Sequence, residues 1–501
     1  MLTATPGTDG PAGDPAATRA PWYCWAIPTA VMAAVGAIGL GSPSLWGDEF
    51  ATWGMATVPW GRATAVLQTV DAVMAPYYAA MNAWVHLAGD SDVALRLPSL
   101  VAMAATAALV GLVGARADGP RTGLVAGVLF ALLPISSAFA QEARVYAFAD
   151  LAVALAGFLL LGVLDRPTWR RLAGYGTAVA LVGLCHLVAL LILLPHAVLV
   201  LVRGRHLLGR WAVAAAAGTV PALPLVWSGW WQRGQIAWLA TFTVTPADYL
   251  SSVGGSVTGG LVVVGLCLLG VGAGRGRARL WFAAWAVLPP LALLAASPVI
   301  PIMLPRYLLF VLPGWMLLAA TGLVRLWDVR GARLGTGATV LARTAAAVAV
   351  VAVAALGVPW QWNLRGPAGH NQEDARALAR TLGDGYRPGD AVVYAQNGDD
   401  SLCCSWMPRD ALNHYTPADR RPADVLLRTP QRAQGRVSAA EYPDVAARLA
   451  APRRVWVVRL GYRTDPLHGL GADREALVRD RFRQAEVTHP AGFTVALLVA
   501  T

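Results

Sequence analysis

Two adjacent carboxylates, Asp48 and Glu49, stand in the stretch S-L-W-G-D-E-F-A-T-W-G-M, which follows the first long apolar segment of the chain. A charged side chain costs about 2.5 to 3.5 kcal/mol at the centre of a membrane helix but much less near the interface. Trp46 and Trp53 fit that depth, because an indole buries its ring and keeps its N–H hydrated. The pair can therefore supply a base at a membrane surface. The alternative is that Asp48 caps a short helix beginning at Glu49.

The composition places this pair in a membrane protein. The 501 residues are 56% hydrophobic and only 14% charged, with a mean hydropathy of +0.51, which is too apolar for an ordinary soluble protein. The formal net charge is +11, but the basic residues are spread over short connectors rather than gathered on one polar surface. We therefore expect a polytopic protein of the lipid bilayer with no nucleic-acid partner.

Eleven apolar runs approach the roughly 20 residues that a spanning helix needs. They lie near residues 25–40, 94–114, 122–140, 146–164, 172–184, 187–202, 211–227, 257–271, 280–296, 307–323 and 345–358. The segment 66–87 mixes Asp71, Asn82 and His86 with apolar residues, so we interpret it as an amphipathic interfacial helix. The expected fold class is an α-helical polytopic membrane protein with about 11 transmembrane helices.

The distribution of arginine predicts the orientation in the membrane. Most arginines between the apolar runs fall in alternate connectors, near residues 116–121, 166–171, 203–210, 275–279 and 325–343. Short cytoplasmic loops are enriched in basic residues, so this side is expected to be cytoplasmic together with the N-terminus. The predicted site and the C-terminal segment then lie on the extracytoplasmic side of the cell membrane.

The Arg-poor connectors hold chiefly Arg62, Arg96, Arg144, Arg233 and Arg306, and two of these stand at the ends of apolar runs. Arg144, in Q-E-A-R-V-Y, and Arg306, in L-P-R-Y-L-L-F, lie where an apolar run meets the Arg-poor side. A guanidinium there can hold a lipid-linked phosphate in bidentate fashion. Alternatively, the two side chains reach the headgroups or pair with an acidic neighbour such as Glu142. Glu142 and Tyr146 flank Arg144, so they orient its guanidinium or cap the next helix.

The sequence divides into three regions. Residues 1–21 are rich in Thr, Pro, Gly and Asp and predict a disordered cytoplasmic tail. Residues 22–358 form the predicted membrane domain, with a first outer loop at 42–93. Residues 359–501 alternate apolar runs at 391–394, 455–459 and 493–499 with helical patterns, which predicts an extracytoplasmic α/β domain. This last region has no dinucleotide-binding, P-loop or metal-ligand spacing.

Several short motifs together resemble a known family. In chain order they are W-G-D-E at 46–49, A-P-Y-Y-A-A-M-N-A-W at 75–84, G-D-S-D-V-A-L-R-L-P-S-L at 89–100, Q-E-A-R-V-Y-A at 141–147, His186, and P-R-Y-L-L-F-V-L-P at 305–313. Their order and membrane side resemble the polyprenol-dependent GT-C glycosyltransferases. The nearest group is family 39, with protein mannosyltransferases and lipid A aminoarabinose transferases, and within it the actinobacterial mannosyltransferase type.

The resemblance implies transfer of a sugar, with mannose as the usual one, from a polyprenyl-phosphate donor to a protein, glycan or lipid acceptor. The transfer inverts the anomeric carbon and takes place on the extracytoplasmic side. Asp48 matches the catalytic acidic position, and Glu49 beside it is expected to be catalytic as well. A lipid phosphate is already a good leaving group, so one base suffices, unlike glycoside hydrolysis with its two carboxylates.

The same resemblance extends to residues that bind the donor phosphate or sugar. They are Arg144, Arg306, Glu142, Tyr146, Tyr77, Tyr78, Arg96 and His186. For the two adjacent tyrosines the alternative is anchoring at the interface, and for His186 it is a structural role.

One departure from the family and one rival function remain. Met74 stands where relatives often carry His, and a thioether replaces imidazole neither as a proton carrier nor as a usual zinc ligand. We therefore assign no metal ligand, and a divalent metal stays an open alternative.

The rival function is a transporter or flippase of a lipid-linked envelope precursor. Such proteins commonly show internal repeats and ionisable groups at mid-membrane depth, which we do not find in the sequence.

Overall fold

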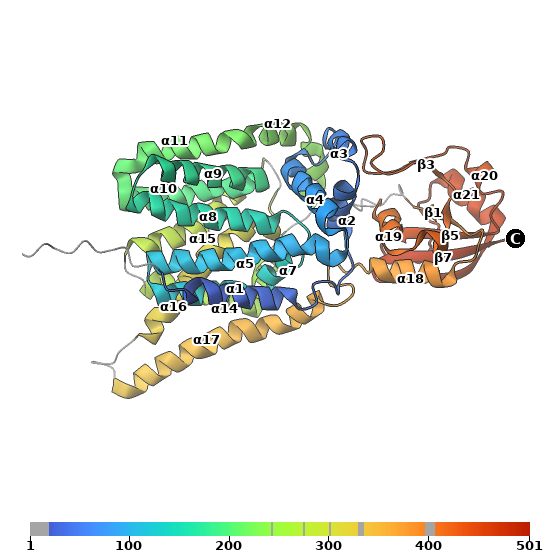
Figure 1. Cartoon of the computed structure of the whole chain (residues 1–501). Helices are drawn as coiled ribbons and strands as arrows, with labels where there is room; N and C mark the ends of the chain where they lie inside the picture. The colour runs from blue at the N-terminus through green and yellow to red at the C-terminus, as the bar shows by residue number, and fades with distance from the viewer. Residues whose placement is uncertain (1–19, 242–243, 274–275, 300–301, 329–334, 396–405) are drawn as a thin grey trace, which may run out of the picture.

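Figure 1 shows the computed structural model of the chain, a bundle of long helices with a smaller domain at one end. The structure describes residues 20–241, 244–273, 276–299, 302–328, 335–395 and 406–501. The predicted N-terminal tail lies almost entirely outside the described residues. The end of the bundle that meets the smaller domain is called the domain end below.

Helices joined by short connectors make up the bundle. They are α1 (Tyr23–Ala37), α5 (Asp92–Ala117), α6 (Pro120–Leu132), α7 (Pro134–Ala140), α8 (Tyr146–Asp165), α9 (Trp169–Cys185), α10 (Leu193–Gly204), α11 (Leu208–Thr219), α12 (Leu223–Trp231), α14 (Val257–Ala273), α15 (Arg277–Ala296), α16 (Leu312–Trp327) and α17 (Gly335–Leu364). Shorter turns join or extend them: η2 (Leu187–Ile192), η3 (Arg205–Leu207), η4 (Val220–Ala222), η5 (Arg233–Thr241) and η6 (Pro305–Val311).

Each of the eleven predicted spans coincides with a helical segment, but fewer meet the length of a span. In the described part of the chain, six helices are long and apolar enough to cross a membrane, or up to eight if each of two bent pairs is one span. Helices α1 and α9 have only 15 and 17 residues. The apolar stretch Leu187–Trp231 has 45 residues and is broken after Gly204, enough for two crossings at about 20 residues each. The chain is a multi-pass membrane protein, and the number eleven stays a prediction.

Four of the five predicted Arg-rich connectors lie together at the end of the bundle opposite the domain end. Asp165, the last residue of α8, pairs with Arg116 at 2.6 Å and with Arg203 at 4.0 Å, so the ends of α5, α8 and α10 and the connectors that follow them are neighbours. Asp118 accepts from Arg325 at 3.1 Å, which adds the end of α16. Figure 1 shows the C-terminal domain at the other end of the bundle.

Small residues let the first helices of the bundle approach closely. A Cβ at Gly111 on α5 would lie 1.8 Å from the carbonyl oxygen of Cys24 on α1. A Cβ at Gly123 on α6 would lie 2.2 Å from the carbonyl oxygen of Gly111. Close backbone contact through small residues is typical of packed membrane helices. It fixes α5, and with it the residues at the start of α5, relative to the rest of the bundle.

Four short elements lie across the domain end: α2 (Gly47–Thr57), α3 (Trp60–Leu67), η1 (Ala72–Met74) and α4 (Ala75–Ala88). Figure 1 shows α2, α3 and α4 between the long helices and the C-terminal domain. The predicted interfacial helix 66–87 is thus divided, because Asp71 adopts φ 58° and separates α3 from η1 and α4. Helix α13 (Pro246–Gly254) precedes α14 at a bend of 85°.

The C-terminal domain is a mixed α/β structure. Its elements are α18 (Ala375–Gly385), β1 (Ala391–Tyr394), α19 (Met407–Tyr415), η7 (Ala418–Arg420), β2 (Ala423–Asp424), β3 (Leu427–Thr429), β4 (Ala440–Glu441), α20 (Val445–Arg448), β5 (Arg454–Leu460), α21 (Ala472–Arg481), β6 (Phe482–Thr488) and β7 (Phe493–Ala500). One sheet has the order β2-β1-β5-β7-β6, with β1 parallel to β2 and β5, and β7 antiparallel to β5 and β6. Strands β3 and β4 form a separate antiparallel pair.

The three predicted strands form the centre of the five-stranded sheet as β1, β5 and β7. Their residues are almost entirely buried, which is why continuous apolar runs mark them. Strand β6 lies at the edge, and its middle residues are exposed. An exposed edge strand carries no such run, so the sequence did not reveal it.

Candidate active site

Asp48 lies in the first turn of α2 rather than at its cap. Helix α2 begins at Gly47, and its N-cap residue is Trp46, which makes no side-chain cap hydrogen bond. The alternative in which Asp48 caps a helix beginning at Glu49 is therefore not what the structure shows. A carboxylate in a first turn is still favoured by the helix dipole.

Two guanidinium groups face Asp48. Its Oδ2 atom lies 3.3 Å from Arg306 Nη1 and 3.7 Å from Arg144 Nη2. Arg144 Nη1 also donates to the Asp48 carbonyl oxygen at 3.2 Å. Asp48 Oδ2 and the Nε atoms of both arginines are buried but make no hydrogen bond to the described residues. The three side chains are 11 to 24% exposed, so this group has unused hydrogen-bonding capacity and remains open to a ligand.

The two arginines belong to two separate segments of the chain. Arg306 is the second residue of η6, and Arg144 lies in the loop between α7 and α8. Before that loop the chain bends by 67° between α6 and α7. Gln141 at the start of the loop is anchored, because its Nε2 donates to the carbonyl oxygens of Gly36 and Ile38 at 2.8 and 2.6 Å. A fixed loop holds Arg144 in place at the domain end.

Glu142 is buried beside the same charges. Burial raises the pKa of its carboxyl to about 8, and the charges of Glu49 and Asp48 push it in the same direction, while Arg306 and Arg144 oppose them. Glu142 is then mostly protonated at neutral pH. Two guanidinium groups therefore face one carboxyl group, that of Asp48, which leaves positive charge available for an anion.

An aromatic group adjoins Arg306. The ring centroids of Tyr146 and His186 are 5.6 Å apart, and that of Tyr307 lies 6.2 Å from Tyr146 and 5.3 Å from His186. The Arg306 guanidinium lies 5.8 Å from the Tyr307 ring centroid. The structure thus brings the predicted residues Tyr146 and His186 next to Arg306. Tyr307 was not assigned to the site, although it follows Arg306 in the motif P-R-Y-L-L-F-V-L-P at 305–313.

The predicted tyrosines of α4 reach the site from another side. Tyr77 packs against Phe148 of α8 at 5.8 Å between ring centroids, and both tyrosines are buried. Tyr78 Oη donates to Asp71 Oδ2 at 3.1 Å. Burial raises the pKa of Asp71, whose charge interacts with Arg144 and Asp48. Asp71 is a second residue that the sequence did not assign to the site, although it lies just before the Pro-Tyr-Tyr motif.

Glu49 and Arg96 form a closed cluster instead. Arg96 Nε and Nη2 donate to the two carboxylate oxygens of Glu49 at 2.8 and 2.6 Å, and both side chains are fully buried. The remaining Arg96 bonds go to the carbonyl oxygens of Leu40, Pro43 and Ser44. The predictions that Glu49 is catalytic and that Arg96 binds the donor disagree with this geometry, because neither side chain is accessible.

This cluster supports the loop that carries Arg144. Glu49 Oε1 accepts from the backbone N–H of Ala143 at 2.9 Å, and Thr52 Oγ1 donates to the Ala143 carbonyl oxygen at 2.9 Å. Burial alone would raise the pKa of Glu49, but the Arg96 guanidinium holds it well below its usual range. Glu49 therefore stays ionised and ties α2 to the Arg144 loop.

No group of three or more His, Cys, Asp or Glu side chains among the described residues converges in a way that could hold a metal ion. Beside Asp48 Oδ2 lie two guanidinium groups, which do not ligate a cation. Met74, at the end of η1, offers only a thioether.

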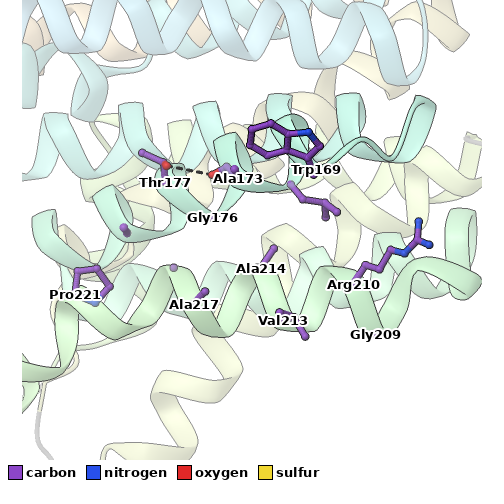
Figure 2. Close-up of a pocket in the computed structure, with 13 residues that line it drawn as sticks. Trp169, Ala173, Gly176, Thr177, Gly209, Arg210, Val213, Ala214, Ala217 and Pro221 are labelled. Carbon is purple, nitrogen blue, oxygen red and sulfur yellow. Dashed lines mark hydrogen bonds between the residues drawn. The ribbon is translucent and has the colours of Figure 1, made fainter.

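A separate apolar groove of about 640 Å³ lies between α9 and α11 (Figure 2). Trp169 and Arg210 lie near one end of it and Pro221 near the other. Small residues such as Gly176 and Ala214 line its middle. None of the site residues predicted from the sequence lines this groove. It is distinct from the Asp48 site.

Comparison with known proteins adds a family and a fold. Residues 70–230, less than half of the chain, match the model of the family described as dolichyl-phosphate-mannose-protein mannosyltransferase. Comparison with curated protein sequences finds no significant match.

Solved structures match over nearly the whole chain. ArnT from Cupriavidus metallidurans bound to undecaprenyl phosphate has a TM-score of 0.56 and 15% identity, covering 94% of this chain and 97% of that chain. Its apo state gives a TM-score of 0.57 and 14% identity over the same shares. The archaeal oligosaccharyltransferase AglB from Archaeoglobus fulgidus gives 0.47 and 11%, covering 87% of this chain and 70% of that chain.

These matches bear on two expectations from the sequence. The predicted fold class, a polytopic helical membrane protein with a C-terminal α/β domain, is confirmed by the described structure and by its likeness to ArnT. The matched family is one of glycosyltransferases that use a lipid-phosphate sugar. The predicted resemblance of this chain to the GT-C glycosyltransferases is thereby confirmed.

Proposed function

We propose that the chain is a membrane glycosyltransferase that moves a sugar from a polyprenyl-phosphate donor to a protein, glycan or lipid acceptor. The observation that carries the proposal is the position of Asp48 Oδ2, 3.3 Å from Arg306 and 3.7 Å from Arg144. These three residues come from three distant segments and meet in one partly open group. Such a group offers a base and an anion-binding pair side by side.

The proposed reaction needs one base. The acceptor hydroxyl gives its proton to Asp48 as its oxygen attacks the anomeric carbon of the sugar. The bond from that carbon to the phosphate oxygen breaks on the opposite face, so the configuration inverts. The polyprenyl phosphate leaves with the bonding electron pair and needs no protonation by a second carboxyl group.

Arg144 and Arg306 are proposed to bind the donor phosphate. In the structure their guanidinium groups face Asp48, and the Nε atom of each has no hydrogen-bond partner among the described residues. A phosphate between them would receive charge-assisted hydrogen bonds from both, and these strengthen as charge grows on the leaving group. Contact with the phosphate would also free Asp48 to act as a base.

The substrates are inferred from similar proteins. The name of the matched family includes dolichyl-phosphate-mannose, which supports mannose as the sugar and a polyprenyl phosphate as its carrier. ArnT, which shares the fold, was crystallised with undecaprenyl phosphate. We propose Tyr77, Tyr78, Tyr146, His186 and Glu142 as further residues around the donor, as expected from the sequence.

We propose an orientation in the cell membrane from the charges. Four of the five Arg-rich connectors share one end of the bundle, which we assign to the cytoplasm with the N-terminus. The Asp48 site and the C-terminal domain lie at the other end and are assigned to the extracytoplasmic side. The proposed units are the membrane domain, residues 22–358, and the α/β domain, residues 359–501.

The test replaces Asp48 by Asn, which keeps the shape of the side chain but takes up no proton at neutral pH. In proteoliposomes supplied with mannosyl-phosphoryl-undecaprenol and a membrane extract as acceptor, Asp48→Asn is expected to transfer mannose at least about 10²-fold more slowly. Asp248→Asn is the matched control, since Asp248 also lies in the first turn of a helix, α13, and serves in a capping box. Transfer by Asp48→Asn near the parental rate would contradict the proposal.

A further inference from the structure

Helix α2, which carries Asp48, begins without a cap of its own. The first backbone N–H groups of a helix have no partner within it and need one when they are buried. Trp46, the N-cap residue, provides no side-chain acceptor. Gly47 N instead donates to Glu373 Oε2 at 3.1 Å, although the two residues are 326 positions apart. The cap of α2 therefore comes from the segment that opens the C-terminal domain.

The chain that leads into α2 is held by the same segment. Ser44 Oγ donates to the carbonyl oxygen of Glu373 at 3.1 Å and accepts from the backbone N–H of Ala375 at 2.9 Å. Leu45 N donates to Tyr415 Oη at 2.8 Å, which adds a bond from α19. These bonds fix the entry into α2 from outside the membrane domain.

The side of α2 that packs on the C-terminal domain is closely fitted to it. Phe50 lies 6.1 Å from Tyr415, and Trp53 lies 5.2 Å from His414, between ring centroids. A Cβ at Gly54 would lie only 2.0 Å from Cζ of Arg432. A helix fitted this closely on one side, and bonded to the Arg144 loop through Glu49 and Thr52 on another, cannot shift independently of the C-terminal domain.

Glu373 is itself held in place. Asn371 Nδ2 donates to its Oε1 atom at 2.7 Å, so the other carboxylate oxygen is directed to Gly47. The residue is only 7% exposed. Its bond to Gly47, the residue before Asp48, places its carboxylate at the start of the helix that carries Asp48. Glu373 therefore has a fixed orientation close to the proposed base. Among the hydrogen bonds and ion pairs of the described residues, none joins Glu373 to Arg144 or Arg306.

We propose that Glu373 is a positioning residue, which caps α2 from the C-terminal domain and thereby fixes Asp48 relative to Arg144 and Arg306. The inference rests on the proposed role of Asp48 as the base. A displacement of about 1 Å in a reacting group can cost about 10²-fold in rate, so the cap acts on turnover. Donor affinity depends on the arginines and is expected to stay unchanged.

The experiment compares three variants in proteoliposomes supplied with mannosyl-phosphoryl-undecaprenol and membrane extract. Glu373→Ala removes the acceptor for Gly47 N and is expected to lower kcat about tenfold with the KM for the donor unchanged. Glu373→Gln keeps a carbonyl oxygen for Gly47 N and is expected to retain most of the rate. The matched control is Asp374→Ala, because Asp374 Oδ1 accepts from Ala377 N at 2.8 Å and caps α18 instead.

A double-mutant cycle separates positioning from a general structural role. If Glu373 acts through Asp48, adding Glu373→Ala to Asp48→Asn should cause little further loss in single-turnover rate. If the Ala variant does not fold, Glu373→Asp replaces it, since a shorter side chain withdraws the carboxylate from Gly47. Parental kcat in Glu373→Ala or Glu373→Asp, or a full additional loss in the double variant, would overturn the inference. Parental kcat in Asp48→Asn would instead overturn the proposed function.

Discussion

Asp48 and Glu49 are adjacent in the sequence, but their side chains lie in different surroundings in the structure. Successive residues of an α-helix point about 100° apart, so the two carboxylates leave α2 in different directions. Glu49 enters a cluster in which Arg96 satisfies both carboxylate oxygens and no atom is exposed. Asp48 faces Arg144 and Arg306 at longer distances, with an oxygen that makes no hydrogen bond to the described residues.

This difference in exposure and in hydrogen bonding distinguishes a structural ion pair, Glu49 with Arg96, from a candidate catalytic group around Asp48. The Glu49 cluster is saturated, so a substrate finds no free donor or acceptor there. The Asp48 group keeps unused donors and an unused acceptor, which in a buried place is costly unless a ligand or water completes it. The Glu49–Arg96 cluster also supports the open group, which consists of Asp48, Arg144 and Arg306. It does so because Glu49 and Thr52 bind the loop that carries Arg144.

The largest expected effect comes from breaking the closed cluster. Arg96→Met leaves the Glu49 carboxylate buried without its partner and frees three backbone carbonyl oxygens. Removing one member of a buried ion pair typically costs about 3 to 5 kcal/mol, so we expect a strong fall in thermal stability of the detergent-purified protein. The control is the double variant Arg96→Met with Glu49→Gln, which carries no unpaired charge and should recover part of the loss. An unfolding temperature equal to the parental one in Arg96→Met would contradict the structural role.

The next effect comes from breaking the open group. Arg144→Ala and Arg306→Ala should each weaken binding of undecaprenyl phosphate by about 10- to 100-fold, because hydrogen bonds to charged groups contribute about 1.5 to 3 kcal/mol. Their thermal stability should change less than that of Arg96→Met, since both side chains are partly exposed. Native mass spectrometry with undecaprenyl phosphate measures the affinity. Arg233→Ala is the control, because Arg233 is exposed and contacts only Trp230 in the described bonds.

Unchanged affinity in both variants would mean that the arginines serve only to pair with Asp48. Arg144→Lys sharpens the test, since an ammonium keeps the charge but loses the planar fork of donors. Affinity between those of the Ala variant and the parental protein is the expected outcome.

The sequence predicted the membrane fold and the open group better than the closed one. Apolar runs follow directly from burial in lipid, so all eleven predicted spans coincide with helices. Arg144 and Arg306 were recognisable because they stand on an Arg-poor side. The ion pair between Glu49 and Arg96 could not be predicted in this way. The two residues are far apart in the sequence, and no local pattern indicates that they bind each other rather than a substrate.

The contact between the C-terminal segment and α2 could not be predicted from the sequence either, because it also joins residues that are far apart in the chain. The bond from Gly47 to Glu373 joins residues 326 positions apart, and no local pattern encodes it. Around Glu373 the sequence shows only a helical pattern, at residues 373–382, which says nothing of a contact with Gly47. Asp71 was likewise visible as a polar residue in a mixed segment, but its φ of 58° and its bond to Tyr78 depend on tertiary contacts.

The smallest expected effect concerns Glu142, which borders both groups. Burial raises its pKa to about 8 from an ordinary value of 4.5, so the folded protein holds this proton more tightly than the unfolded chain does. The associated stability is complete below about pH 4.5 and is lost as the pH rises through about 8. Glu142→Gln imitates the protonated side chain at every pH. We therefore expect its unfolding temperature to match the parental value near pH 4.5 and to exceed it by a few degrees at pH 8.5. The measurement is thermal unfolding of the detergent-purified proteins at both pH values, and an equal difference at the two would show that Glu142 does not change protonation on folding.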